Sequence, residues 1–211
     1  KRTEIFMSGN IDTIIDYWFG AIEDQLSPPE KYALWYNSKR EDDKFIKDKF
    51  EHLYQQAMLG HLDSWLDSAK GTMALIILLD QMPRNMYRGE AQAFAGDHLA
   101  LHHCLKGIEK GFDKQLQLVE RCFFYHPLEH AEDIKMQELC VLQFQRLQQV
   151  YQGDKQQNFI RNSLDFAHKH LQIIEKYGRF PYRNSVLERE STVEEIEFLK
   201  TGVNFGQSSN K

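Results

Sequence analysis

Polar side chains crowd together directly after the most apolar stretch of the sequence. Residues 73–79 are apolar throughout, and the polar residues that follow are Asp80, Gln81, Arg84, Asn85 and Arg88. A buried helix that ends in such groups needs hydrogen-bond partners for them. Arginine can hold a carboxylate or a phosphate through two N–H groups, and asparagine can both donate and accept. The group predicts a site for a small anion; in the alternative interpretation it only satisfies carbonyls at the helix end.

A second polar turn of similar composition occurs later in the chain. Residues 83–85 (Pro-Arg-Asn) resemble residues 181–184 (Pro-Tyr-Arg-Asn), and each segment follows a long predicted helix. The candidate ligand-binding residues of the second turn are Arg179, Arg183, Asn184 and Arg189. If the two turns converge, their arginines form one pocket for a carboxylate or a phosphate. If they do not, acidic side chains such as Glu129 and Glu132 and loop carbonyls hold these arginines instead.

The third group is residues 126–130, which match the inverted zinc-protease motif H-x-x-E-H. That chemistry needs both histidines on one face of a helix. Pro127 is well placed to begin the helix, which would turn His126 away from that face. We therefore predict no metal ion and no other cofactor. The candidates for acid/base catalysis are Asp80, Glu129 and His130. Alternatively, the last two only form a fixed ion pair with an arginine.

Other histidines and the tryptophans have simpler interpretations. His98 and His102 share one face of a predicted helix, which we expect to be exposed to solvent. His170 is expected to point inward and to be a hydrogen-bonded core residue rather than a ligand. Trp35 is expected in the core, with a place in a pocket wall as the alternative.

Apolar residues at helical spacing divide nearly the whole chain into helices, and valine and proline are scarce. Residues 73–79 predict a central buried helix that ends before Pro83, with a strand as the alternative. Ser191 and Glu194 form a capping-box pattern that opens a last short helix. The other predicted helices span residues 11–19 (with Asn10 as N-cap and Gly20 as stop), 45–57, 96–110, 116–125, 127–152 and 154–177.

The composition is that of an ordinary globular protein. The chain has 211 residues, 42% of them apolar, and a formal net charge of −5. This predicts one domain over residues 1–211 with short flexible tails, the C-terminal one at residues 206–211. The acidic charge argues against a nucleic-acid partner, and no apolar run is long enough to span a membrane. Three cysteines without a CxxC pair indicate a reduced, cytoplasmic protein.

Short motifs spread along the chain form a recognisable set. They lie at residues 16–20, 78–85, 88–89, 93–95, 127–130, 178–181 and 183–184. Together they resemble the bacterial domain-of-unknown-function 924 family, which is similar to tetratricopeptide-like helical proteins. The resemblance implies an all-α superhelical array of antiparallel helix pairs without a sheet, and it implies no reaction. Two positions depart from the pattern. Tyr182 stands where the family usually has histidine, and Glu188 where it usually has glycine, which makes a positive φ angle harder to reach.

Two functions from different classes agree with these motifs. The first is a small-molecule site, for binding or catalysis, in which the arginine turns hold a carboxylate or a phosphate. It predicts that Arg84, Glu129, His130, Arg179 and Arg183 line one pocket. The second is a tetratricopeptide-like scaffold for a protein or peptide partner, or for self-association, with an exposed groove or apolar patch elsewhere. A metal hydrolase built on residues 126–130 is a minor third alternative. None of them predicts the oligomeric state.

Overall fold

The computed structural model describes residues 2–207, with side chains described from Asn10 onward. In this part of the chain there is no β-strand, and one isolated bridge joins Glu23 and Leu26. The all-α fold class is therefore confirmed. The α-helices are α1 (Arg2–Phe19), α2 (Pro29–Tyr36), α3 (Arg40–Met58), α4 (Ala69–Ile76), α5 (Met82–Met86), α6 (Asp97–Glu109), α7 (Leu118–Phe124), α8 (His126–Glu129), α9 (Ile134–Val150), α10 (Asp154–Tyr177) and α11 (Val193–Leu199).

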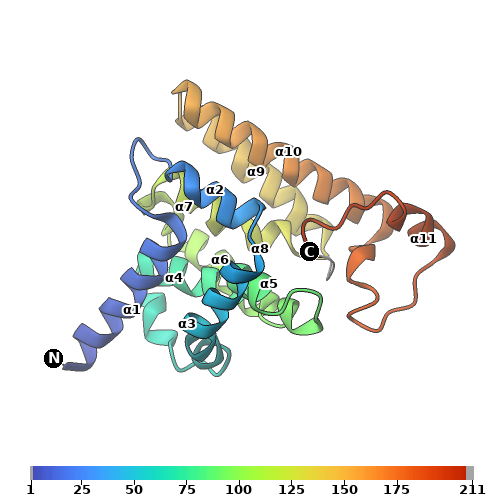
Figure 1. The fold of residues 1–211 in the computed structure, drawn as a ribbon. Coiled ribbons are helices and arrows are strands. Elements are labelled where there is room, and N and C mark those ends of the chain that lie inside the picture. Colours follow the sequence, from blue (N-terminus) through green and yellow to red (C-terminus); the bar gives the residue numbers. More distant parts are fainter. Residues whose placement is uncertain (1, 208–211) are drawn as a thin grey trace.

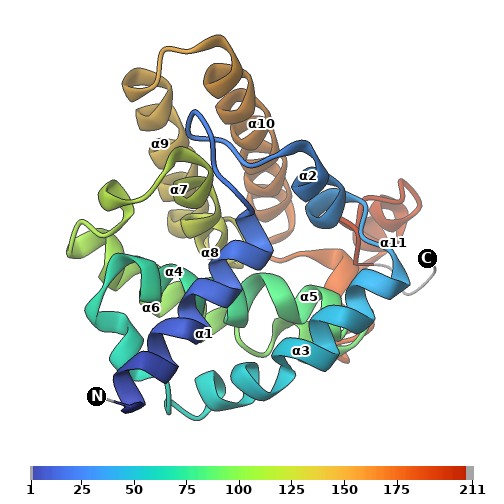
Figure 2. The same ribbon diagram turned by 60° about the vertical axis from the view of Figure 1, so that its left-hand side comes forward.

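One apolar helix runs through the centre of the fold (Figure 2). α4 continues through a π-helical turn, Ile77–Gln81, into α5, and α1, α3 and α6 pack around this unit. Every residue from 73 to 79 is at most 1% exposed. The central buried helix expected from the apolar run is therefore confirmed.

The central helix does not end before Pro83, contrary to the expectation from the sequence. It continues to Met86, because the wider π turn accommodates a proline that lacks an N–H donor. The carbonyl of Leu79, four residues before Pro83, lies against Gly96, where an added β-carbon would stand 2.4 Å from the carbonyl oxygen. Gly96 thereby allows the start of α6 to pack directly on the turn that carries Asp80.

α9 and α10 form an antiparallel hairpin along one side of the molecule (Figure 1). α10 ends at Gly178, which adopts a φ of 69° as expected for a glycine that terminates a helix. The single helix predicted over residues 127–152 is divided into α8 and α9. Residues 130–133 leave the helix, and the Asp133 side chain caps the first turn of α9.

Several helix boundaries differ from the sequence-based prediction. α1 begins at Arg2, so Asn10 lies inside this helix and is not its N-cap. The capping box of α11 is formed by Thr192 and Glu195, one residue later than predicted, because Ser191 binds Asn184 instead. Glu188 reaches a φ of 54° without being glycine. Of the predicted tail, residues 208–211 lie outside the described residues.

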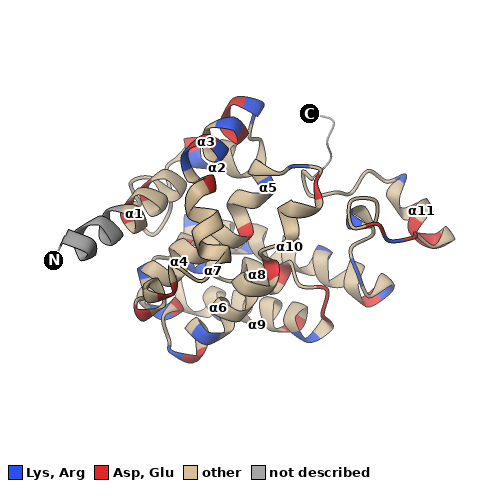
Figure 3. Ribbon diagram, turned by 90° about the horizontal axis from the view of Figure 1, so that it is seen from below, with Lys and Arg blue, Asp and Glu red and all other residues tan. Residues whose placement is uncertain are grey.

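The outside of the molecule carries charges of both signs, interspersed along the helices (Figure 3). No helix in the described part of the chain is both long and apolar enough to cross a membrane. Cys104, Cys122 and Cys140 are buried free thiols, and burial raises the pKa of each of them. The cysteines thus behave as core residues rather than as reactive groups.

Candidate functional site

A cavity of about 610 Å³ lies between α2, α5, α8 and α10, and residues 205–207 complete its lining. α5 and α8 contribute mainly polar side chains, and α2 contributes aromatic ones. The volume is that of a typical small-molecule site. Of the residues predicted from the sequence, the lining includes Gln81, Arg84, Asn85, Arg88, Glu129 and His130.

Arg84 of α5 and Arg88, two residues after α5, line the cavity, and a carboxylate holds each of them. Arg84 donates from Nη1 and Nη2 to the two carboxylate oxygens of Asp97, at 2.9 and 3.0 Å. Arg88 donates from Nε and Nη2 to Asp43, at 2.8 and 3.0 Å. Asn85 donates to the same Asp43 at 2.7 Å. These bonds fix the guanidinium groups in place and offset their charge.

Asp80 is fully buried and holds His130. Its carboxylate accepts a 2.7 Å hydrogen bond from His130 Nδ1, and Arg84 Nη1 lies 3.4 Å from the same oxygen. Because Nδ1 carries the proton of this bond, Nε2 is the nitrogen of the neutral ring that remains for a ligand. The π turn supplies Asp80, and such turns are frequent at functional sites. Asp80 therefore does not line the cavity but positions a residue that does.

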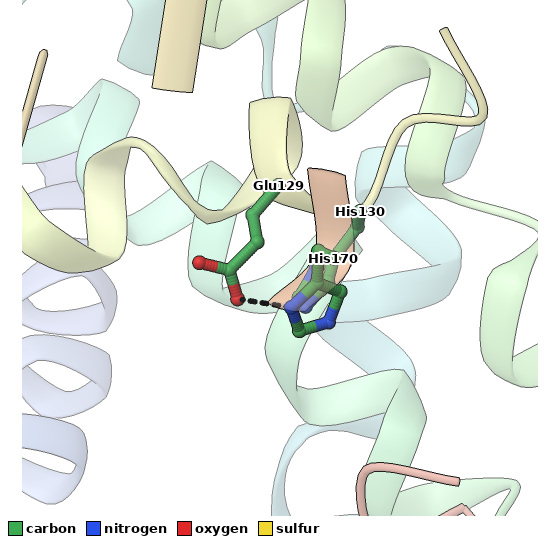
Figure 4. Close-up of side chains that lie close together, drawn as sticks. All are labelled: Glu129, His130 and His170. Atoms are coloured by element: carbon green, nitrogen blue, oxygen red, sulfur yellow. Dashed lines mark ion pairs between the residues drawn. The ribbon is translucent and has the colours of Figure 1, made fainter. Parts of the chain in front are cut away.

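Glu129, His130 and His170 form a compact group in the cavity wall (Figure 4). One potential ligand atom from each lies within 4.8 Å of the other two. Glu129 Oε1 is 3.4 Å from His170 Nδ1, which donates a 2.9 Å hydrogen bond to the carbonyl of Phe166. His170 is buried and hydrogen-bonded as predicted, but it also lines the cavity. Two imidazoles and a carboxylate are able to hold a metal ion.

His126 lines the same cavity. Its ring centroid is 5.7 Å from that of His130, and its Nδ1 is buried without a hydrogen-bond partner among the described residues. His126 is already the first residue of α8, with Pro127 as the second. The expectation that Pro127 turns His126 away from His130 is therefore wrong.

Burial shifts the titration of these groups toward their neutral forms. It raises the pKa of Glu129 to about 8, and the neighbouring Asp80 carboxylate adds to this increase. It lowers the pKa of His126 to about 3 and that of His170 to about 4. Burial and the Arg84 guanidinium hold the pKa of His130 well below its ordinary value. The imidazoles of the wall are therefore neutral at pH 7.

The second arginine turn meets the first through Asp97 rather than inside the cavity. Arg183 Nη1 lies 3.4 Å from the carboxylate of Asp97, which Arg84 also binds. Its Nη2 donates to the carbonyl of His130 at 3.1 Å, and its guanidinium lies 4.6 Å from the ring centroid of Phe180. Arg183 does not line the cavity but supports the segment that carries His130.

The other predicted residues of this turn form a network of their own. Arg189 binds both carboxylate oxygens of Glu132, at 2.6 and 2.9 Å. Arg179 binds Glu195 in the same way, at 2.7 and 2.8 Å, and Asn184 donates to the same carboxylate at 3.3 Å. Arg179, Asn184 and Arg189 do not line the cavity. The pair of Arg189 with Glu132 is one that the alternative interpretation of this turn named, whereas Glu195, the partner of Arg179, was not predicted.

The Arg179–Glu195 pair predicts a pH-dependent contribution to stability. Hydrogen bonds from Arg179 lower the pKa of Glu195 to about 2, whereas an unfolded glutamate titrates near about 4.3. Because the folded pKa is the lower one, this contribution is present above the unfolded pKa and is lost as the pH falls toward 2. We expect Glu195→Gln to lower the urea midpoint clearly at pH 7 and by roughly half as much at pH 3.

The control for this measurement is Glu197→Gln on the same helix. Glu197 pairs with Lys200, but the two side chains are 72% and 68% exposed. Such exposed pairs contribute little to stability, so the midpoint should hardly change at either pH. An equal loss of stability at pH 7 and pH 3 in Glu195→Gln would contradict the prediction.

Aromatic side chains of α2 and α10 form another part of the cavity wall. Tyr36 and Phe166 are 55% and 40% exposed, and their rings lie at 8° to each other with centroids 6.3 Å apart. Trp35 also lines the cavity, so its alternative prediction, a place in a pocket wall, is the one that the structure supports. This wall gives the cavity a large apolar surface next to its polar groups.

No residue of α10 was predicted to line a ligand site. The helix nevertheless carries a signal, because one of its faces mixes short polar and aromatic residues at helical spacing. The α10 residues that line the cavity at this spacing include Phe159, Asn162, Ser163, Phe166 and His170. Phe205 is a further lining residue without such a signal, since it lies outside any helix.

The sequence matches one family model over most of its length. The model describes a bacterial protein of unknown function (DUF924) and matches residues 14–203. The chain belongs to the DUF924 family. A solved structure of a protein of unknown function, ATU0120 from Agrobacterium tumefaciens, is similar, with 35% sequence identity and a TM-score of 0.77. The similarity covers 93% of this chain and 99% of that one. No curated protein matches this DUF924 chain.

Proposed function

We propose that this DUF924 protein binds a small molecule in which a carboxylate or phosphate group is joined to an apolar, preferably aromatic, body. One observation carries the proposal. A single cavity of about 610 Å³ is lined by polar groups of α5 and α8, by aromatic rings of α2 and α10, and by further polar side chains of α10. A largely apolar wall with a few convergent polar groups is typical of small-molecule sites.

Arg84 is the best candidate to bind the anionic group. Asp97 and the backbone carbonyl of Asp80 accept three of its five N–H donors, which leaves Nε and one Nη2 proton for a ligand. Four donors of Arg88 are already engaged. The Asn85 amide lies in the same wall. A carboxylate or phosphate beside Arg84 would replace water at donors that the protein already holds in position.

The aromatic wall would bind the rest of the ligand. Tyr36 and Phe166 line the cavity and yet remain 55% and 40% exposed, although large aromatic side chains are stabilised by burial. Stacking on a ligand would remove this surface from water. Glu129 and His130 would lie next to the bound molecule, with Asp80 behind His130. Glu129 and His130 remain the acid/base candidates, and Asp80, which was also a candidate, positions His130 instead.

The test is a thermal-shift panel with 3-phenylpropionate, phenyl phosphate and the neutral amide of 3-phenylpropionate, in EDTA. We expect the two anions to raise the melting temperature of the wild type and the amide to have little effect. A ligand at 100 times its dissociation constant stabilises the native state by about 2.7 kcal/mol. For a domain of this size that corresponds to a shift of roughly 5–10 °C.

Two variants show whether the shift comes from this cavity. Phe166→Ala removes a half-exposed ring from the wall and should reduce the shift, while the melting temperature without ligand changes little. Phe45→Ala is the matched control, because Phe45 is 47% exposed on α3 and does not line the cavity. The proposal fails if no anion stabilises the wild type, or if the amide or Phe166→Ala gives the same shift.

A second candidate is a tetratricopeptide-like scaffold that binds a protein or peptide or associates with itself. It is favoured by α11, on which Val193 is 84% and Ile196 51% exposed. An apolar face of this kind suits a protein partner. The same thermal-shift panel distinguishes the two candidates, because a scaffold function predicts that small aromatic anions do not raise the melting temperature.

A further inference from the structure

We infer that Glu129, His130 and His170 form a binding site for a first-row divalent metal ion such as Zn²⁺. The H-x-x-E-H pattern pairs Glu129 and His130 with His126, but the fold brings His170 of α10 to them instead. The sequence predicted no metal ion, and it indicated that His170 was a hydrogen-bonded core residue rather than a ligand. Two histidines and one carboxylate with an open fourth position form a common catalytic zinc site.

The geometry needs only a small movement to close around an ion. The three potential ligand atoms lie within 4.8 Å of one another. With bonds of about 2.1 Å in a tetrahedral site, ligand atoms stand about 3.4 Å apart. Rotation of the two imidazole rings and of the Glu129 side chain that brings both Nε2 atoms and one carboxylate oxygen to this spacing would close the group around an ion. The cavity adjoining the group leaves room for water or a further ligand on the ion.

Both histidines have the outer hydrogen bonds that metal-binding histidines require. His130 donates Nδ1–H to the Asp80 carboxylate at 2.7 Å, and His170 donates Nδ1–H to the Phe166 carbonyl at 2.9 Å. A metal-binding histidine typically donates its other ring N–H to a carboxylate or to a backbone carbonyl, which fixes the tautomer. In both rings Nε2 is thus the nitrogen with a free lone pair.

Glu129 would be the negatively charged ligand of the group, because a carboxyl ligand gives up its proton when a metal ion binds. Its side chain is 7% exposed, and no arginine or lysine of the described residues forms an ion pair with it. The nearby Arg84 and Arg183 pair with Asp80 and Asp97 instead. No cationic side chain of the described residues therefore competes with a metal ion for this carboxyl group.

The experiment measures Zn²⁺ binding by isothermal titration calorimetry after removal of metal with EDTA and of EDTA by gel filtration. We expect one Zn²⁺ per chain and no comparable binding of Mg²⁺, which prefers oxygen ligands. Glu129→Gln, which has nearly the same shape, and His170→Ala should each weaken Zn²⁺ binding by at least about 10-fold, the smallest loss expected even for an outer partner of a ligand. Circular dichroism shows whether each variant is folded.

The matched control is His102→Ala. His98 and His102 are exposed and one turn apart on α6, so they are another place where Zn²⁺ could bind. This variant should bind Zn²⁺ like the wild type. The inference is overturned if the wild type does not bind Zn²⁺, if folded Glu129→Gln and His170→Ala bind it normally, or if His102→Ala alone loses it. The proposed ligand is absent here, and EDTA is present in the ligand panel, so either proposal can fail without the other.

Discussion

Asp80→Ala is expected to reduce the free energy of unfolding by about 3–5 kcal/mol, the usual result of removing one partner of a buried ion pair. Asp80 has no exposed surface, and its carboxylate contacts His130, Arg84 and Gln81. Without it, the buried His130 Nδ1–H has no acceptor, and Arg84 retains only Asp97 as an acidic partner. The measurement is urea denaturation of the metal-free protein, followed by circular dichroism.

The matched control for this prediction is Asp48→Ala. Asp48 also forms an ion pair one helical turn away, with Lys44, but their side chains are 62% and 75% exposed. Exposed pairs of this kind contribute about 0.3–0.5 kcal/mol. If Asp80→Ala costs no more than Asp48→Ala, the Asp80 carboxylate does not hold His130 and Arg84 as described.

Phe123→Ala is expected to have an equally large effect, a loss of about 3–5 kcal/mol. Phe123 is 1% exposed, and its ring packs on Phe19, Trp35 and His126 with centroid distances of 5.4, 4.6 and 4.5 Å. The ring therefore connects α1, α2 and α8 through α7. The variant would leave a cavity behind Trp35, and natural domains have only about 5–15 kcal/mol of stability in total.

The same substitution at Phe45 shows what an exposed ring contributes. Phe45 is 47% exposed and stacks on Tyr17 with a centroid distance of 5.3 Å. Its replacement should cost about 1 kcal/mol or less, since one aromatic pair contributes about 0.5–1.5 kcal/mol. Equal midpoints for Phe123→Ala and Phe45→Ala in urea would contradict the role of Phe123 in the core.

The local parts of the fold could be predicted because their causes are local. The apolar run 73–79 is the buried central helix, and Gly20 and Gly178 end helices with positive φ angles. Such features depend on residues three or four positions apart. The sequence-based prediction was wrong where a contact with a residue far along the chain changed the local backbone conformation. The central helix passes Pro83 through a π turn that packs against Gly96, and the box of α11 is shifted because Ser191 binds Asn184.

The candidate site likewise has parts that could be predicted from the sequence and parts that could not. The sequence by itself determined that polar residues follow the apolar run, and Gln81, Arg84, Asn85, Arg88, Glu129 and His130 do line one cavity. It also placed arginines in the second turn, but many acidic side chains compete for an arginine. Only packing brings Asp97 between Arg84 and Arg183, and Glu195 to Arg179.

Tertiary structure alone decided the composition of the metal-binding group. His170 lies on a different helix from Glu129 and His130, and its own helix periodicity indicated only that it points inward. Residue type and spacing specify which face of a helix is buried. They do not specify which faces of distant helices meet, because that depends on how the whole set of apolar faces packs together.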